Sequence, residues 1–302
     1  MSEKRIKRKV NVDIPSAMKK LKVIINLLMT TKFLETYVSV FRGKGLEFDS
    51  YRSYTPDDDA SLIDWKASAR TKELLVRKYV EERKLEVFFL VDVSNSMVFG
   101  STEKLKNEYV AELVVAIANA VLTAGDKVGY ALFNSDITIK SPPLTGKKQF
   151  YKLANALVNP NTYGGGFDLY NALKFPLSFL KPGGIIFVIS DFIGMKDDNW
   201  TKPLKWLSVN FDVICLMIRD PRDKMLPRDA GQVLVADPYS HREVLVDAKL
   251  VREAYQAYVE RQEKELKRLT LESGVNFTSI STDKSFVKPI VELFVMRKRR
   301  WK

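Results

Sequence analysis

The sequence feature that most constrains the fold begins at residue 86, where short apolar runs start to alternate with helical stretches. Residues 87–91 are apolar throughout, which is typical of a strand buried on both faces of a sheet. In residues 104–123, apolar side chains recur at helical spacing and line one face. This alternation predicts an α/β fold with a doubly wound, Rossmann-like, mostly parallel sheet flanked by helices.

The same alternation continues toward the end of the chain. Strands are predicted at residues 128–133, 137–140, 185–189, 213–218 and 275–280, and helices at residues 150–157, 169–180, 248–273 and 286–299. Two further apolar runs, 233–236 and 243–246, flank a turn and predict a β-hairpin inserted into the domain.

Upstream of residue 86 the pattern is different. Residues 14–35 are predicted to form a helix, and residues 36–70 short strands and turns that end in a helical turn. We therefore divide the chain into an N-terminal helix and following segment packed on the core (1–85), an α/β domain (86–285) and a C-terminal basic helix and tail (286–302).

The net charge of +12 is concentrated at the two ends of the chain. Residues 1–10 carry a net charge of +4 and residues 297–302 a net charge of +5, which leaves +3 for the 286 residues between them. A nearly neutral body argues against a broad basic groove for nucleic acid. The basic ends either help to keep the chain in solution or make weak contacts with nucleic acid or an anionic membrane surface.

Cysteine and histidine are scarce. The single cysteine, Cys215, excludes a disulfide framework, and its place in a predicted strand indicates a core thiol. The single histidine, His241, excludes the usual two- and three-histidine metal sites. No apolar run approaches the roughly 18 residues that span a bilayer, and the basic start is not followed by the apolar segment of a signal peptide. We therefore expect a cytoplasmic protein.

Short oxygen-bearing side chains follow two of the predicted strands. Asp92, Ser94 and Ser96 stand at alternate positions where the strand at 87–91 ends, and Asp191 follows the strand at 185–189. In open α/β sheets, ligands bind beyond the carboxyl ends of the strands. Hydroxyl and carboxylate oxygens suit a hard cation such as Mg²⁺. The alternative is that the first three residues merely cap a helix that starts near residue 101.

These residues resemble the metal-ion-dependent adhesion site of von Willebrand factor A domains. An upstream string of motifs makes the resemblance more specific. In order it reads Arg42-Gly43-Lys44-Gly45-Leu46-Glu47-Phe48, Arg52-Ser53-Tyr54, Pro56-Asp57-Asp58-Asp59, Ile63-Asp64-Trp65, Ser68-Ala69-Arg70 and Glu81-Glu82. Over roughly residues 15–285 the chain resembles domain-of-unknown-function family 58, which joins this signature to a von Willebrand A-like domain. It departs from the family pattern at Asp57 and Ser61.

The resemblance implies a metal site held by Asp92, Ser94, Ser96 and Asp191. The ion would be Mg²⁺, with Mn²⁺ or Ca²⁺ as alternatives, and an open position on it would accept a carboxylate from a partner protein. The neighbouring loop would be Gly165, Gly166, Phe167 and Asp168. Phe167 stands where the adhesion site has a threonine ligand, and a phenyl ring cannot bind a metal. The alternative is a degenerate site that recognises a partner without metal.

The resemblance also implies a function and a partner. Members of the family are typically encoded with MoxR-type AAA+ ATPases and are thought to act with them in chaperone-like assembly or maturation of protein complexes. We therefore expect a non-enzymatic protein–protein interaction module. The residues expected to dock a partner are Arg52, Asp58, Asp59, Asp64, Trp65 and Arg70. The alternative is that these alternating charges form a salt-bridged segment packed against the sheet.

Two other function classes stay open. A metal-dependent hydrolase or phosphatase would use Asp92 and Ser94, but the second aspartate of the phosphatase motif is absent, and so are nucleophile-elbow and P-loop motifs. Some von Willebrand A proteins bind RNA, and here only the basic ends would favour that function.

Overall fold

The structure, a computed structural model, describes residues 47–80, 84–195, 197–227 and 231–300. Its body is built on a six-stranded sheet in the order β10-β7-β6-β3-β4-β5. The strands are β3 (Glu86–Asp92), β4 (Lys127–Phe133), β5 (Ile137–Leu144), β6 (Ile185–Ser190), β7 (Asp212–Arg219) and β10 (Asn276–Ser281). All neighbouring pairs are parallel except β4 and β5. The predicted fold class, a mostly parallel α/β sheet, is confirmed.

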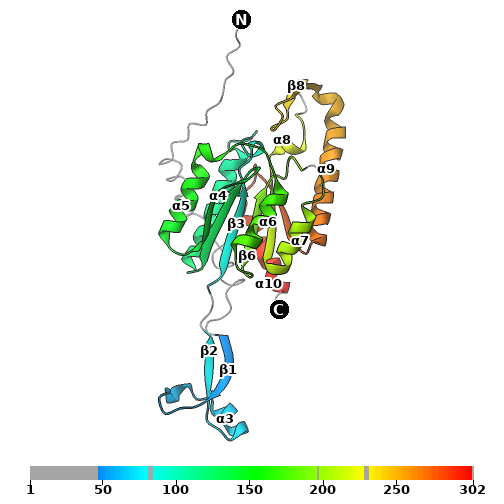
Figure 1. The fold of residues 1–302 in the computed structure, drawn as a ribbon. Helices are drawn as coiled ribbons and strands as arrows, with labels where there is room; N and C mark the ends of the chain where they lie inside the picture. Colours follow the sequence, from blue (N-terminus) through cyan, green and yellow to red (C-terminus); the bar gives the residue numbers. More distant parts are fainter. Residues whose placement is uncertain (1–46, 81–83, 196, 228–230, 301–302) are drawn as a thin grey trace.

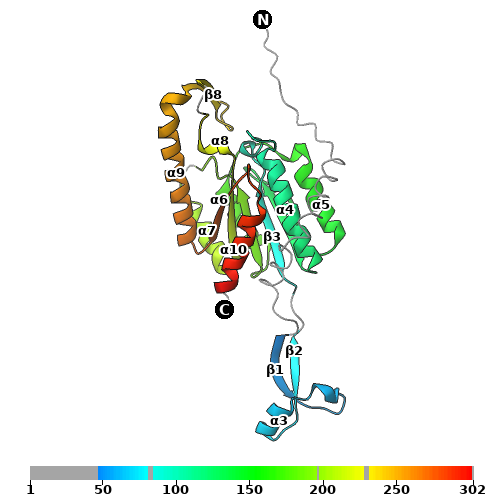
Figure 2. The same cartoon turned by 180° about the vertical axis from the view of Figure 1, so that it is seen from behind.

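Helices cover both faces of this sheet (Figures 1 and 2). One face packs against α4 (Lys106–Thr123), α5 (Lys147–Val158) and α10 (Val287–Arg300), and the other against α6 (Leu169–Phe179), α7 (Thr201–Asn210) and α9 (Ala248–Glu272). Strand β3 shows why, because Phe88 and Leu90 belong to one apolar core while Phe89 and Val91 belong to the other. Side chains alternate between the faces of a strand, so the continuous apolar run 87–91 of β3 contributes to both cores.

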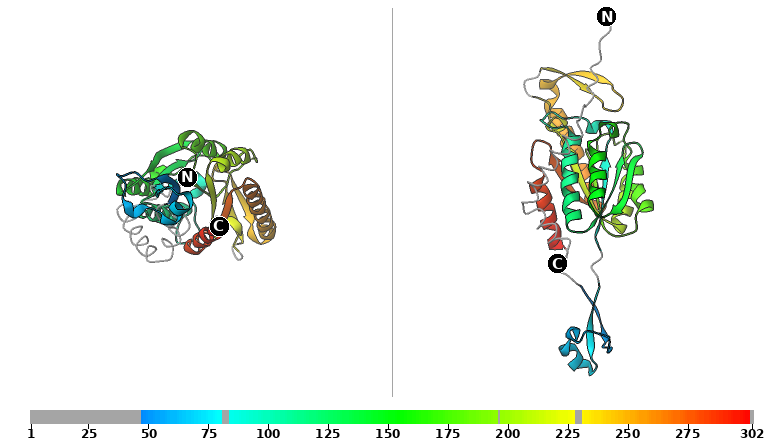
Figure 3. Two further views of the ribbon diagram at one scale, coloured as in Figure 1. Left: turned by 90° about the horizontal axis from the view of Figure 1, so that it is seen from below. Right: turned by 90° about the vertical axis from the view of Figure 1, so that its left-hand side faces the viewer.

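A hairpin interrupts the alternation between β7 and β10. After the short helix α8 (Pro221–Lys224), strands β8 (Gln232–Ala236) and β9 (Glu243–Asp247) pair antiparallel, which confirms the predicted insertion. Asp247 then begins α9, because its carboxylate accepts a hydrogen bond from the Lys249 N–H group. In Figure 3 the hairpin lies beyond one end of the central sheet.

Residues 47–80 form a small unit, which we call the signature unit. It consists of β1 (Glu47–Ser53), α3 (Trp65–Thr71) and β2 (Leu75–Val80), with β1 and β2 paired antiparallel. Figures 1 to 3 show it beyond the end of the body where β3 begins, opposite the end that bears the β8–β9 hairpin. It does not cover a face of the six-stranded sheet, so the predicted packing on the sheet is not what the structure shows.

The signature unit has an interior of its own, which is the physical reason for this difference. Val76 is buried, and the carboxylate of Asp64 accepts a hydrogen bond from the Tyr51 hydroxyl at 2.9 Å. The Ser68 hydroxyl donates to the Asp64 carbonyl at 2.8 Å and accepts from the Leu75 N–H group at 2.8 Å. These contacts tie α3 to the two strands without help from the body.

Several predictions concern residues that the structure does not describe. The predicted helix at 14–35, the motif at 42–46 and the N-terminal basic residues lie outside the described residues. In the described ranges, none of the helices combines the length and apolar character needed to cross a bilayer.

Candidate functional site

The predicted site residues of the α/β domain lie together at one edge of the sheet. Asp92 is the last residue of β3 and Asp191 directly follows β6, and these strands are parallel neighbours. The Ser96 hydroxyl donates to Asp191 Oδ1 at 3.1 Å, and the Ser94 and Ser96 hydroxyl oxygens are 3.2 Å apart. We call Asp92, Ser94, Ser96 and Asp191 the strand-end cluster.

The strand-end cluster is closed to solvent. Asp92, Ser94 and Asp191 are 0% exposed and Ser96 is 3% exposed. Asp92 Oδ2 accepts a hydrogen bond from the Ser190 hydroxyl at 2.6 Å, and Oδ1 accepts one from the Ser94 N–H group at 2.8 Å. Burial and, secondarily, the nearby Asp191 charge raise the pKa of Asp92 to about 7 despite these hydrogen bonds.

A lysine completes the charge of the cluster. Lys106 Nζ lies 2.7 Å from Asp191 Oδ2 and 2.9 Å from Asp223 Oδ2, and the Lys106 side chain is 1% exposed. Burial by itself would lower the pKa of Lys106, but the two carboxylates raise it above its ordinary value. Sequence reasoning missed this residue. The available signal was a lysine at the start of a helix whose other residues are largely apolar.

The tip of the β8–β9 hairpin reaches the same cluster. The Tyr239 hydroxyl oxygen lies 3.0 Å from Ser96 Oγ, 3.2 Å from Ser94 Oγ and 2.9 Å from the Ile193 carbonyl. Beside it, the Asn95 side-chain amide donates to the Pro238 carbonyl at 3.1 Å. Sequence reasoning also missed Tyr239, because its contact with Ser94 joins residues 145 positions apart.

The predicted site loop is held close to the cluster by its backbone. The Gly164 N–H group donates to the Val93 carbonyl at 2.8 Å, and the Gly165 N–H group donates to Asn95 Oδ1 at 3.1 Å. Gly165 has a φ of +85°, and a Cβ atom there would lie 2.8 Å from Asn134 Nδ2. A glycine is therefore required for this close approach. Gly166 is the next residue of the same loop.

The side chains of Phe167 and Asp168 make their contacts outside the strand-end cluster. The Phe167 ring packs with its centroid 6.0 Å from that of Phe133, at the apolar core under α6. Asp168 is the N-cap of α6 and accepts a hydrogen bond from the Asn171 N–H group at 3.0 Å. The structure therefore brings together Asp92, Ser94, Ser96 and Asp191, but not these two loop side chains. The alternative role as caps near residue 101 is not seen, since α4 begins at Lys106.

The donor set does not fit a hydrated divalent ion as it is arranged. Asp191 Oδ2 faces the Lys106 ammonium, and its Oδ1 accepts from Ser96 Oγ and from the Ile193 N–H group at 2.9 Å. Both serine hydroxyls contact the Tyr239 hydroxyl. Within the described ranges, no three carboxylate, imidazole or thiol groups gather in a way that could hold a metal ion.

The predicted docking residues lie in the signature unit. Arg52 and Asp58 form an ion pair, and Asp58 also accepts from the Thr55 N–H group at 2.9 Å. Asp59 and Asp64 are helix caps, the first for the short 3-10 helix Ala60–Leu62 and the second for α3. The carboxylates of Asp59 and Asp64 therefore stabilise the helix starts within the signature unit.

Trp65 and Arg70 are presented to solvent by the same unit. Trp65, at the start of α3, is 67% exposed. Arg70 lies exposed in the last turn of α3.

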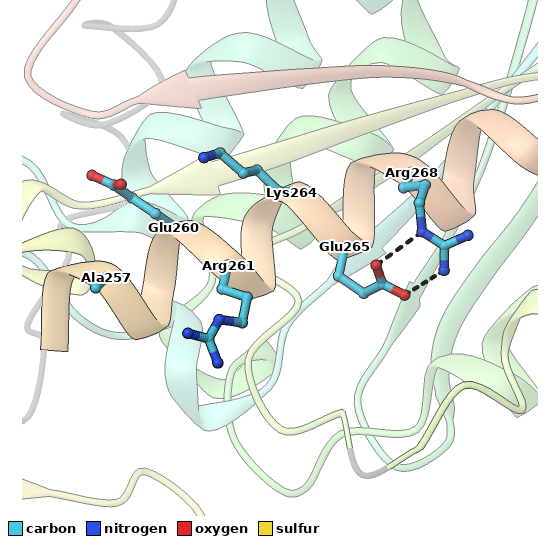
Figure 4. A pocket seen from close by; sticks show the side chains of 6 residues that line it. All are labelled: Ala257, Glu260, Arg261, Lys264, Glu265 and Arg268. Atoms are coloured by element: carbon cyan, nitrogen blue, oxygen red, sulfur yellow. Dashed lines mark hydrogen bonds and ion pairs between the residues drawn. The ribbon is translucent and has the colours of Figure 1, made fainter. Parts of the chain in front are cut away.

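Two hollows lie on the surface near α9. Figure 4 shows a shallow one whose lining comes from α9 alone: Ala257, Glu260, Arg261, Lys264, Glu265 and Arg268. Glu265 and Arg268 form an exposed ion pair there, so this is a solvated helix face with charges of both signs. The second hollow, of about 600 Å³, lies beside the strand-end cluster and is lined in part by Ile193, Arg219, Asp223 and Tyr255.

Comparisons with known proteins identify relatives in sequence and in structure. The chain is 27% identical over 267 residues to the uncharacterized protein Rv1480 of Mycobacterium tuberculosis, with 87% of this chain and 83% of that protein covered. The conserved hypothetical protein BatB from Bacteroides thetaiotaomicron is similar in structure, with a TM-score of 0.49, 17% identity and coverage of 72% of this chain and 99% of that one. A von Willebrand factor type A structure from Catenulispora acidiphila has a TM-score of 0.35 and 19% identity, and covers 49% of this chain and 36% of that one.

The family comparison covers most of the chain. Residues 50–265 match a family model, and this range includes most of the signature unit, the whole strand-end cluster and the β8–β9 hairpin. The chain therefore belongs to the family described as "Protein of unknown function DUF58".

Proposed function

We propose that this protein is a non-enzymatic protein–protein interaction module that works with a MoxR-type AAA+ ATPase, in chaperone-like assembly or maturation of protein complexes. The signature unit is its docking surface for the ATPase. Membership of the DUF58 family and the α/β fold are consistent with an interaction module. A cytoplasmic location is part of the proposal, because the ATPase needs ATP.

The observation that carries this proposal is the exposure of Trp65. Its side chain is 67% exposed, and the neighbouring Leu62 and Leu74 are 45% and 46% exposed in the same small unit. Large exposed apolar side chains on a unit that stands apart from the body are typical of an interaction surface. Tryptophan is also among the residues that dominate the binding energy of protein interfaces.

The polar residues of the signature unit support the same interpretation. Asp64 caps the helix that begins with Trp65, with its carboxylate accepting from Lys66 and Ala67 N–H groups at 3.0 and 3.2 Å. The Arg52–Asp58 ion pair holds the preceding loop. A tryptophan on a fixed helix start loses less conformational entropy on binding than one on a mobile loop.

The strand-end cluster favours neither catalysis nor a metal-bridged contact. Ser94, Ser96 and Ser190 are at most 3% exposed, so a phosphoester or peptide substrate would not reach their hydroxyls without movement of the hairpin. The same closure keeps a partner's carboxylate away from a divalent ion at Asp92 and Asp191. Nucleic-acid binding has no comparable support in the near-neutral body of the chain.

Binding of the full-length chain to the MoxR-type ATPase of the same organism tests the proposal. Biolayer interferometry would compare wild type with Trp65→Ala, in the presence of ADP and of a non-hydrolysable ATP analogue. We expect Trp65→Ala to weaken binding at least about tenfold, as for an interface hot spot. Trp206→Ala is the matched control, because Trp206 is 54% exposed but lies on α7 in the body.

Two results would contradict the proposal. One is absence of binding by the wild-type chain in every nucleotide state. The other is equal weakening by Trp65→Ala and Trp206→Ala, which would place the contact elsewhere. Metal-dependent phosphatase activity in wild type, lost in Asp92→Ala, would favour the enzymatic alternative.

A further inference from the structure

We propose that the ammonium group of Lys106 is the resident cation of the strand-end cluster, in the position where a divalent metal ion would be expected. Its two carboxylate partners come from different elements. Asp191 directly follows β6, and its Oδ2 lies 2.7 Å from Lys106 Nζ. Asp223 lies in α8, and its Oδ2 is 2.9 Å from Lys106 Nζ. The ammonium thus joins two elements across the sheet edge, as a bridging metal ion would. This inference concerns the cluster alone and does not rest on docking through the signature unit.

Two features of the position of Lys106 are unfavourable for a cation. It is the first residue of α4, where the positive end of the helix dipole disfavours a cation. Its side chain is also 1% exposed, and burying a charge is costly unless it is paired. The Phe99 ring, with its centroid 5.5 Å from Nζ, supplies a further favourable contact. The contacts with the two carboxylates therefore account for a buried lysine at this position.

The ammonium leaves little for a second cation to bind. It neutralises charge at Asp191, whose other oxygen accepts from Ser96 and Ile193. Mg²⁺ needs about six oxygen ligands at about 2.1 Å. To gain them at this edge it would have to displace Lys106 from Asp191 and Tyr239 from the two serines. Phe167 adds no ligand, because its ring lies against Phe133.

A consequence follows for how the site is assembled. Lys106 keeps the two carboxylates together in the absence of metal, so the end of β6 and the short helix α8 are joined without it. Chelators then have no effect on the stability of the protein, and binding through any surface of the chain is independent of Mg²⁺ except where the partner itself needs the ion.

Thermal unfolding and Mn²⁺ titration of the full chain test the inference. The variants are Lys106→Met, which keeps the length of the side chain without its charge, and Lys106→Met/Asp191→Asn, which also removes the charge of Asp191 and leaves Asp223 as the one carboxylate that faced the lysine. Lys104→Met is the control, because Lys104 forms a more exposed ion pair with Glu112 in the same region. Each protein is measured in EDTA and in millimolar MgCl₂ or MnCl₂, and Mn²⁺ binding is followed by electron paramagnetic resonance.

We expect wild type to show no saturable Mn²⁺ binding and the same Tm in EDTA and in MgCl₂. Lys106→Met should lower Tm by roughly 10 °C, because the buried carboxylates of Asp191 and Asp223 both lose their cation. The double variant should recover at least half of that loss, whereas Lys104→Met should change Tm little. If Lys106→Met does not fold, the Tm of the double variant and the Mn²⁺ titration of wild type still test the inference.

The inference is overturned by saturable Mn²⁺ binding to wild type that raises Tm and is lost in Asp191→Asn. It is also overturned if Lys106→Met is as stable as wild type. Neither result bears on the Trp65 experiment, so failure of this inference and failure of the proposed docking surface can be told apart.

Discussion

The hydroxyl group of Tyr239, at the tip of the β8–β9 hairpin, lies 3.2 Å from the hydroxyl oxygen of Ser94, just beyond the end of β3. The two residues are 145 positions apart, and the contact attaches the inserted hairpin to the central sheet. Burial raises the pKa of Tyr239 above its ordinary value, so the hydroxyl stays neutral at physiological pH. The hairpin is therefore part of the candidate site as well as an insertion in the fold.

Removing the Tyr239 hydroxyl should loosen the hairpin. In Tyr239→Phe the ring remains, but Ser94 and Ser96 lose a hydrogen-bond partner in a buried place. We expect a loss of about 1–2 kcal/mol in the free energy of unfolding. Hydrogen exchange at residues 231–247 should become faster. Tyr258→Phe is the control, because Tyr258 is 56% exposed on α9. Unchanged exchange in Tyr239→Phe would show that the hydroxyl does not hold the hairpin.

A glycine beside the hairpin offers a second, independent test of this attachment. Gly194 has a φ of +97°, and a Cβ atom at this position would lie 2.5 Å from Tyr239 Cε2. In Gly194→Ala the tyrosine ring must therefore move away from the strand-end cluster. We expect a loss of about 2 kcal/mol or more in the free energy of unfolding, from backbone strain and crowding together.

The matched control for this variant is Gly183→Ala. Gly183 has a φ of +103°, and a Cβ atom at this position would meet no other atom within 4 Å. It should show the backbone strain alone, with hydrogen exchange in the hairpin unchanged. If the two variants change hydrogen exchange at residues 231–247 equally, the close contact of Gly194 with Tyr239 is not what holds the hairpin.

Much of the α/β domain was predictable because its strands and helices have clear apolar patterns in the local sequence. Residues 87–91 of β3 and 185–189 of β6 are apolar throughout and buried. Parallel strands end at one edge, so the meeting of Asp92 with Asp191 followed from the strand assignments alone. Helix α7 was not predicted, although Leu204 and Leu207 bury a narrow apolar stripe, because most of its other residues are polar or exposed.

The parts of the site that were not predicted depend on contacts between distant segments. Lys106 pairs with Asp191 over 85 positions and with Asp223 over 117 positions. No spacing rule connects such residues. The signature unit is a different case, because packing on the sheet was the alternative interpretation of its alternating charges. Its carboxylates instead cap its own short helices, as Asp59 and Asp64 show.

Asp92 should make the stability of the protein depend on pH. Its pKa is raised to about 7 in the folded protein, mainly by burial, and is about 3.9 in an unfolded chain. Between these values the folded state binds more protons, so the free energy of unfolding falls as pH rises from about 4 to 7. Asp92→Asn removes this titration.

We expect Asp92→Asn to be more stable than wild type at pH 8 and to show a flatter pH dependence between about 4 and 7. Urea denaturation across this range measures both. Asp136→Asn, in the exposed bend after β4, is the control and should follow wild type. A variant that is less stable than wild type at pH 8 would mean that the Asp92 charge is compensated in the folded protein.

Phe167→Thr tests which residue keeps a metal ion from this edge. It restores the threonine that the adhesion-site pattern expects, but Lys106 still occupies the side of Asp191 that a metal would use. We therefore expect no saturable Mn²⁺ binding in the single variant. The lost packing on Phe133 should lower the free energy of unfolding by about 1–3 kcal/mol. Phe175→Thr, which loses a ring contact with Phe179 on the same helix, is the control for that loss. Mn²⁺ binding by Phe167→Thr would show that the missing threonine, and not the lysine, is what excludes the ion.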